Sequence, residues 1–260
     1  MTEAVIVAYA RTPIGRANKG SLVDCRPDDL SALVIKSVLE RVEKLDPALV
    51  EYVLWGCGQP AGEAGTNVAR VAALLAGIDA PGVTVNRYCS SSLQTIRMAA
   101  HAIKAGEGDV FVAGGVETVS RFMNGMADGG PANTLFSDAR ARSKAREAGD
   151  QGPWAAPNGL SDVYIAMGQT AENVVEQENV SREAMDAWGV RSQERAVAAQ
   201  ERGFFDREIV PVPVPQRRGD PVMVTTDEHP RPGAGSRHSA HSVTPQTTAG
   251  GVGNDDVALD

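Results

Sequence analysis

Cys89 is the residue whose type and position best suit chemistry. It lies between an apolar stretch at 83–86, which predicts a buried strand, and a helical pattern at 90–105 that ends at Gly106. At the amino end of a helix, unpaired backbone N–H groups and the helix dipole favour the nucleophilic thiolate. The same N–H groups can stabilise an oxyanion that develops on a thioester or ketone carbonyl. Acyl transfer is therefore one interpretation. A buried and inert cysteine is the alternative that spacing alone leaves open.

The remaining metal-binding residue types show no pattern of a metal site. The chain has three cysteines and four histidines, and neither Cys25 nor Cys57 stands in a CxxC or Cys/His spacing that binds zinc. We therefore expect no metal ion, and reduced thiols in a reducing compartment.

The composition and charge of the chain exclude two broad classes of function. The 260 residues include 33 acidic and 25 basic side chains, a net charge of −8, whereas phosphate binding needs clustered positive charge. No apolar run reaches the length of a transmembrane helix, and the amino terminus lacks the features of a signal peptide. We expect a cytoplasmic protein with no nucleic-acid partner and no membrane contact.

Alternating strand and helix signals predict the frame that positions Cys89. Strands are expected at 4–8, 52–55, 83–86 and 110–113, and helices at 27–45, 67–76 and 90–105. This alternation predicts α/β layers around parallel strands, with 4–8 as a buried strand. The helix after Cys89 is expected to carry one apolar stripe, formed by Leu93, Ile96, Ala100 and Ile103.

The pattern changes after residue 120. Residues 121–160 have weak periodicity and are too long for a simple connection, so we expect a functional loop region there. Two helices are predicted at 170–178 and 181–202. Residues 209–214 are extended but interrupted by prolines, which excludes a central strand. Residues 233–260 contain almost no large apolar side chains and predict a disordered tail.

Several motifs, in one consistent order, resemble the thiolase family. The segment NRYCSSSLQ (86–94) is similar to the active-cysteine motif of these enzymes, and closest to the form in degradative 3-ketoacyl-CoA thiolases. GDVFVAGGVETVS (108–120) resembles the AGGxExMS signature that follows it. The resemblance extends to VIVAYARTPIGRANKGSL (5–22), GEAGTNVAR (62–70), the run 167–212 and TTDEHPRP (225–232).

The resemblance implies the thiolase fold, an α/β fold in which two similar halves pack into αβαβα layers. This chain would supply the N-terminal half, as an incomplete core over 1–120 and a coenzyme A-binding loop domain over 121–245. The segment 233–260 would be an aberrant tail. Because family members form homodimers or homotetramers, the full-length protein is expected to do the same.

Roles for single residues also follow from the resemblance. Cys89 would take up an acyl group as a thioester and pass it to coenzyme A or acetyl-CoA. Acyl-CoA is then a substrate, and no cofactor is bound permanently. Leu160 and Met167 match positions along the path of pantetheine and adenine, and Arg217 matches a basic residue near the nucleotide. The alternatives are core packing for Leu160 and Met167, and a solvated surface side chain for Arg217.

Three parts of the family's catalytic machinery have no match in the chain: the CxGG cysteine, the GHPxG histidine and the NEAF asparagine. We therefore expect a truncated chain that is inactive alone. His229 lies within TTDEHPRP, so no catalytic role is expected for it. Ala166 replaces a histidine and Ser92 a glycine of the family pattern, while Glu117 is expected to make a structural hydrogen bond.

The implied activity is that of an acyl-CoA C-acyltransferase that cleaves 3-oxoacyl-CoA with coenzyme A, in fatty acid or related acyl-CoA degradation. The alternatives are an acetyl-CoA acetyltransferase that forms acetoacetyl-CoA, and a non-catalytic remnant that binds coenzyme A. Similarity ends abruptly after Pro232, where the apolar pattern of a core strand also stops. We attribute 233–260 to a shifted reading frame or a sequencing error, and the alternative is a chimeric or deliberately truncated chain.

Overall fold

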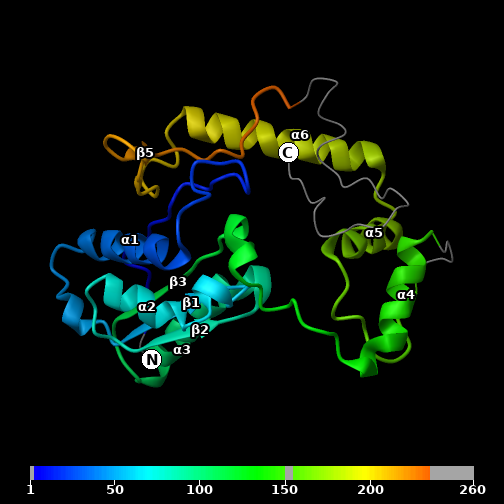
Figure 1. The fold of residues 1–260 in the computed structure, drawn as a ribbon, viewed down its shortest axis with the longest axis horizontal. Helices are drawn as coiled ribbons and strands as arrows, with labels where there is room; N and C mark the ends of the chain where they lie inside the picture. Colours follow the sequence, from blue (N-terminus) through cyan, green and yellow to red (C-terminus); the bar gives the residue numbers. More distant parts are fainter. Residues whose placement is uncertain (1–2, 150–154, 235–260) are drawn as a thin grey trace. The chain divides into compact units, whose positions relative to one another are not determined.

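The computed structural model describes residues 3–149 and 155–234 (Figure 1). The predicted tail, apart from its first two residues, lies outside the described residues. The chain divides into two compact units: the first unit contains 1–129 and 203–229, and the second unit contains 130–202 and 230–260. None of the helices in the described ranges is long and apolar enough to span a membrane.

A parallel three-stranded sheet forms the centre of the first unit. Its strands are β1 (Tyr52–Gly56), β2 (Gly82–Val85) and β3 (Phe111–Gly115), in the order β2-β1-β3. Val53 is in register with Gly82 of β2 and with Val112 of β3. Helix α2 (Val68–Leu75) connects β1 to β2, and α3 (Ser91–Ala105) connects β2 to β3. These strands and helices confirm the predicted parallel α/β arrangement.

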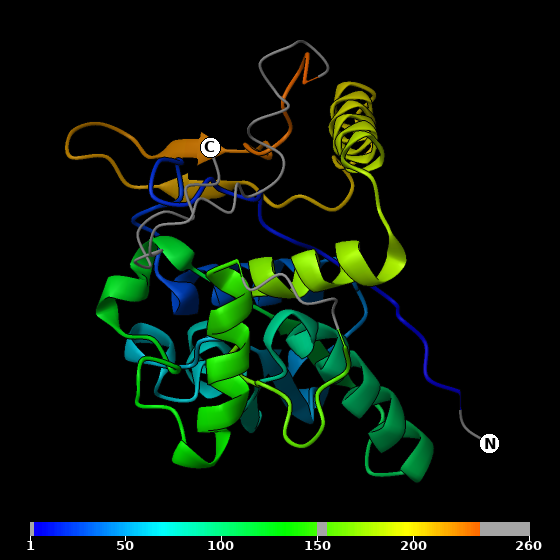
Figure 2. The same ribbon diagram turned by 90° about the vertical axis from the view of Figure 1, so that its right-hand side faces the viewer.

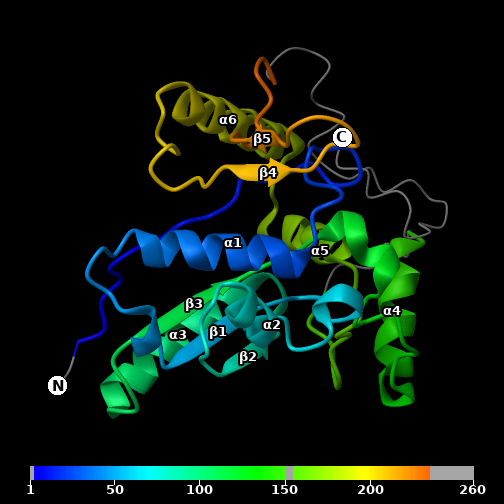
Figure 3. The ribbon, with the colours of Figure 1, turned by 60° about the vertical axis from the view of Figure 1, so that its left-hand side comes forward.

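Different helices cover the two faces of this sheet (Figure 3). Helix α1 (Pro27–Glu40) packs on α2, and the two contribute to one buried cluster with β1. In that cluster the Trp55 indole N–H donates to Ser31 Oγ over 2.9 Å, so the buried polar groups are paired. Helix α3 packs against β1 and β3 on the opposite face. Four short 3-10 helices complete the described frame: η1 (Pro47–Leu49), η2 (Gly62–Ala64), η3 (Tyr88–Ser90) and η4 (Val119–Asn124).

The prediction of a buried strand at 4–8 is wrong. The segment forms no strand, and Val5, Ile6 and Val7 are 70%, 73% and 75% exposed. Within the described residues no neighbouring strand offers it backbone hydrogen bonds, and a strand cannot form without a partner. The segment instead borders a cavity of about 650 Å³, whose other walls come from α1, α3 and β3.

The predicted apolar stripe of α3 does not make the contact with the sheet. Ser91, Thr95 and Ala99 are the buried residues of this helix. Of the predicted stripe, Leu93 is 69% exposed, while Ile96, Ala100 and Ile103 line the cavity. Small residues face the sheet because the first turn of α3 approaches the strands too closely for large side chains.

Residues 203–229 return to the first unit, so the units differ from the predicted boundaries of 1–120 and 121–245. An antiparallel pair, β4 (Val212–Val214) and β5 (Val222–Val224), buries Val212 and Val224 against Leu30 of α1. Beyond β5, Asp227 accepts hydrogen bonds of 2.7 and 2.8 Å from the Arg11 guanidinium. Glu228 accepts hydrogen bonds from two backbone N–H groups of the loop after Arg11. Residues 203–229 therefore belong to the first unit because they share a core with α1 and are bonded to Arg11 and the loop after it through Asp227 and Glu228.

Helices make up most of the described part of the second unit. They are η5 (Thr134–Phe136), α4 (Ser137–Glu147), α5 (Met167–Glu178) and α6 (Arg182–Glu201), and the last two confirm the predicted helices. Helices α4 and α5 lie next to each other (Figures 1 and 2). An ion pair between Arg146 and Glu176 joins them. Periodicity missed α4 because its sequence, SDARARSKARE, is charged and only Ala139 is buried.

Candidate functional site

Cys89 lies at the carboxyl edge of the parallel sheet. Strand β2 ends at Val85, the chain turns through η3, and α3 begins two residues after Cys89. The predicted placement between a strand and a helix is therefore confirmed. Its side chain is exposed, so the interpretation of Cys89 as a buried structural cysteine is wrong. Ligands of parallel α/β sheets bind outside the carboxyl ends of the strands, which is where this thiol lies.

The turn before Cys89 has a constrained backbone. Tyr88 has a φ of 46°, in the left-handed region that residues with a Cβ atom disfavour. The Arg87 N–H donates to Ser91 Oγ over 2.8 Å, and the Ser91 hydroxyl donates to the Tyr88 carbonyl over 2.6 Å. The Tyr88 N–H donates to Asn86 Oδ1 over 2.9 Å. Side chains on both sides of Tyr88 thus hold the turn that leads into Cys89.

Two glycines let the start of α3 rest directly on the strand ends. A Cβ atom at Gly56 would lie 2.7 Å from the backbone of Ser91 and Ser92, closer than such atoms approach. A Cβ atom at Gly115 would lie 2.3 Å from Ser92 Oγ. The two glycines of the AGG motif therefore have different neighbours: Gly115 makes room for the start of α3, and a Cβ atom at Gly114 would meet the Trp55 ring at 2.4 Å.

Glu117 fixes the loop after β1 against the turn before Cys89. Its carboxylate accepts a 2.7 Å hydrogen bond from the Gly58 N–H, and the Gly58 carbonyl accepts one of 3.1 Å from Asn86 Nδ2. The expected structural hydrogen bond of Glu117 is therefore present. Desolvation against this loop raises the pKa of the Glu117 carboxyl.

Cys57 lies beside Glu117, with its Sγ atom 3.8 Å from Glu117 Oε1. Burial raises the pKa of the Cys57 thiol to about 11, and the negative charge of Glu117 acts in the same direction. Burial also raises the pKa of the Cys25 thiol. Both thiols are therefore protonated at neutral pH, as expected of inert cysteines.

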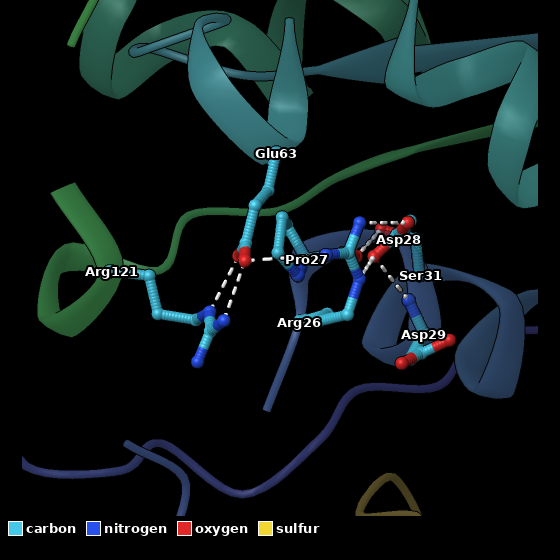
Figure 4. Close-up of polar contacts among 7 residues, drawn as sticks. All are labelled: Arg26, Pro27, Asp28, Asp29, Ser31, Glu63 and Arg121. Atoms are coloured by element: carbon cyan, nitrogen blue, oxygen red, sulfur yellow. Dashed lines mark hydrogen bonds and ion pairs between the residues drawn. The ribbon is translucent and has the colours of Figure 1, made fainter. Parts of the chain in front are cut away.

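An ion-pair network anchors the segment after β3 (Figure 4). Arg121, in the 3-10 helix η4 (Val119–Asn124), donates two hydrogen bonds of 2.5 Å to Glu63 of η2. Glu63 also pairs with Arg26 over 3.2 Å, and Arg26 pairs with Asp28 of α1 over 2.9 Å. The ion pair with Arg121 holds the pKa of Glu63 below its usual value. This network escaped sequence analysis because its members lie far apart in the chain.

The three residues predicted to bind coenzyme A are all exposed. Leu160 and Met167 belong to the second unit and are 52% and 73% exposed, which contradicts core packing for either side chain. Met167 is the first residue of α5, directly after Ala166. Arg217 lies in the first unit, in the loop between β4 and β5. Their contact with coenzyme A stays a prediction.

No group of three or more His, Cys, Asp or Glu side chains that could hold a metal ion occurs within residues 3–149 and 155–234. Three further residues shape the site, namely Gly58, Asn86 and Ser91, and none of them was among the predicted site residues. The available signal was the position of Asn86 and Ser91 on either side of Cys89. Polar residues at such short distances commonly bond to the local backbone.

Comparisons with known proteins match nearly the whole chain. The family described as "Thiolase, N-terminal domain" matches residues 4–241, so the similarity extends beyond Pro232, where it was expected to end. The chain is 45% identical over 238 residues to a beta-ketoadipyl-CoA thiolase of Acinetobacter baylyi, covering 89% of this chain and 57% of the relative. It is 42% identical over 241 residues to an acetyl-CoA acetyltransferase of Cupriavidus necator, covering 90% and 57%.

A solved structure gives the same result for the fold. The crystal structure of the Bacillus anthracis acetyl-CoA acetyltransferase superposes with a TM-score of 0.69 at 33% identity, covering 90% of this chain and 56% of that one. The chain thus spans just over half the length of these relatives.

Proposed function

Because the chain belongs to the thiolase family, we propose that it supplies the acyl-accepting part of an acyl-CoA C-acyltransferase. The observation that carries this proposal is the exposed Cys89 thiol on a constrained turn at the carboxyl edge of the sheet. Of the three thiols, it alone combines exposure with a position at a strand–helix junction, where nucleophiles of acyl transfer are commonly presented.

The reaction divides into two acyl transfers. The Cys89 thiolate attacks the 3-oxo carbonyl carbon of a 3-oxoacyl-CoA, and the bond between carbons 2 and 3 then breaks. The acyl group remains on Cys89 as a thioester, while the carbon 2 side leaves as an enolate and takes a proton to become acetyl-CoA. Coenzyme A thiolate then attacks the thioester, which releases the shortened acyl-CoA and the Cys89 thiolate.

For the substrate we propose a 3-oxoacyl-CoA cleaved by coenzyme A. The fatty acyl chain expected from the sequence receives no specific support from the relatives, several of which are named for beta-ketoadipyl-CoA. Their names favour a dicarboxylic acyl group. Condensation of two acetyl-CoA molecules is the second candidate, supported by the names of the Cupriavidus relative and the Bacillus structure.

Coenzyme A would contact the exposed side chains of Leu160, Met167 and Arg217. The full-length protein would form a homodimer or homotetramer. Steady turnover requires the acid–base cysteine and the histidine of the family, which have no match in these 260 residues. Loss of members of a catalytic unit commonly lowers the rate by several orders of magnitude. We therefore propose that the chain accepts an acyl group without completing catalytic cycles.

Acetyl transfer from acetyl-CoA tests the proposal. The chain is incubated with acetyl-CoA at pH 8, quenched in acid and digested, and the cysteine peptides are analysed by mass spectrometry. We expect one acetyl group on Cys89, none on the Cys89→Ala variant, and no steady cleavage of acetoacetyl-CoA. Binding of coenzyme A without acetylation of Cys89 would instead support a non-catalytic binding protein.

A further inference from the structure

The turn before Cys89 is held by side chains that have no part in the acyl transfers. Tyr88 adopts a left-handed conformation although it carries a side chain, and such a conformation persists only where its surroundings impose it. Cys89 is the next residue, so the conformation of Tyr88 sets the direction in which the thiol is presented.

Two side chains bracket this residue. Asn86 accepts a hydrogen bond from the Tyr88 N–H, and its Nδ2 group donates to the Gly58 carbonyl. Ser91, which is only 4% exposed, accepts from the Arg87 N–H and donates to the Tyr88 carbonyl. Both polar groups of the Tyr88 backbone are therefore bound by neighbouring side chains.

Glu117, which follows β3, connects this support to the strand that lies on the other side of β1 from β2. Its carboxylate binds the N–H of the same Gly58 whose carbonyl receives Asn86. The contacts connect the end of β3, the loop after β1 and the turn after β2. The turn is thus linked to two other segments that are distant from it in the sequence.

We propose that Asn86 and Ser91 are positioning residues that hold Tyr88 in its left-handed conformation and so aim the Cys89 thiol at the acyl carbonyl, with Glu117 fixing Asn86 through Gly58. The inference rests on the proposed function, because it assigns these residues to the nucleophile of that reaction. Without the Asn86 contacts, the Tyr88 backbone relaxes toward negative φ and the thiol loses its direction.

The Asn86→Ala variant tests the proposal, with Asn67→Ala as a matched control. Asn67 is also exposed, has a positive φ of 41° and also donates to a backbone carbonyl, that of Gly82. It accepts from the Thr84 hydroxyl of β2, but it precedes α2 and is not part of the turn before Cys89. Two rates are measured on Cys89: acetyl transfer from acetyl-CoA, which depends on the direction of the thiol, and alkylation by iodoacetamide, which depends on exposure and on the thiolate fraction but little on direction. We expect Asn86→Ala to lower the ratio of acetyl transfer to alkylation about tenfold, and Asn67→Ala to leave the ratio unchanged.

A second set of variants, made in the Tyr88→Gly chain, separates a positioning role of Asn86 from a general effect on stability. Tyr88→Gly removes the penalty for positive φ, so adding Asn86→Ala to Tyr88→Gly should change the ratio by less than about twofold. Asn86→Asp keeps the acceptor for the Tyr88 N–H, so its ratio of acetyl transfer to alkylation should lie above that of Asn86→Ala. An unchanged ratio in Asn86→Ala, or an equal fall in Asn67→Ala, would overturn the proposal.

Hydrogen exchange distinguishes failure of this inference from failure of the proposed function. The Tyr88 amide proton should exchange at least about tenfold faster in Asn86→Ala than in the unchanged chain. If the unchanged chain shows a protected Tyr88 amide but no acetyl transfer, the proposed function fails while the contacts stand. If acetyl transfer occurs and the Tyr88 amide exchanges equally fast in both chains, the inference fails and the proposed function stands.

Discussion

At the scale of single residues, the three thiols differ in exposure, and burial changes the acidity of two of them. Cys89 is exposed, whereas burial raises the pKa of Cys57 to about 11 and also raises that of Cys25. At pH 8 the thiolate fraction of Cys57 is therefore about one part in a thousand. We expect limited iodoacetamide to label Cys89 at least about tenfold faster than either other thiol, because only the thiolate reacts. Peptide mass analysis after short exposure measures the three rates.

Unfolding provides the control for this comparison. In concentrated urea all three thiols lose their burial, and their labelling rates should converge. In the folded Cys89→Ser variant, Cys25 and Cys57 should remain slow. Labelling of Cys57 ahead of Cys89 in the folded chain would contradict both the exposures and the assignment of the nucleophile.

At the scale of the elements, the approach of α3 to the sheet decides where Cys89 lies. A methyl group at Gly56 would meet the backbone of the first turn of α3, so that turn must shift. Overpacking of this kind lowers the free energy of unfolding by about 1–3 kcal/mol. We expect Gly56→Ala to show that loss in urea unfolding, together with slower acetyl transfer to Cys89.

The matched variant is Gly129→Ala, also in the first unit, where an added Cβ atom would only make an ordinary contact 3.8 Å from the Met126 carbonyl. Its unfolding midpoint should stay close to that of the unchanged chain. Equal midpoints for Gly56→Ala and Gly129→Ala would show that α3 does not need the close approach.

At the scale of the whole molecule, the chain has the N-terminal half of the thiolase fold, and carboxylates tie its first unit together. Burial opposes ionisation of Asp227, but hydrogen bonds from Arg11 and Ile14 outweigh it and lower its pKa. Hydrogen bonds from Arg121 lower the pKa of Glu63. Lowered carboxyl pKa values stabilise the fold above the unfolded values near 4, and this stability is lost as the pH falls through the folded values. Burial raises the pKa of Glu117, so its contribution to stability is instead lost as the pH rises.

We therefore expect the urea midpoint of the first unit to fall between pH 6 and pH 3. Asp227→Asn should lose about 1.5–3 kcal/mol at pH 7 and show a weaker dependence on pH, because its charged hydrogen bonds to Arg11 are gone. The control is Asp79→Asn, since the Asp79 side chain is 91% exposed in its ion pair with Arg70. If the urea midpoints of the two variants depend on pH in the same way, Asp227 is excluded as a main source of the pH dependence of stability.

The sequence by itself determined the features that depend on neighbouring residues. The strands around 52–56, 82–85 and 111–115, the helix after Cys89 and the place of that cysteine between strand and helix all follow from local periodicity and from Gly106. Motifs in a consistent order were enough to identify the family, because each motif is a local string.

Only the tertiary structure decided which distant segments meet. Residues 4–8 have the composition of a buried strand, yet they stay exposed because no neighbouring strand pairs with them in the described residues. The face of α3 that meets the sheet is set by the glycines of two strands, not by its own apolar stripe. Gly58, Asn86 and Glu117 come together from three loops. Composition and spacing do not predict such contacts, because the contacts form only when the packed layers bring the ends of the strands to one edge of the sheet.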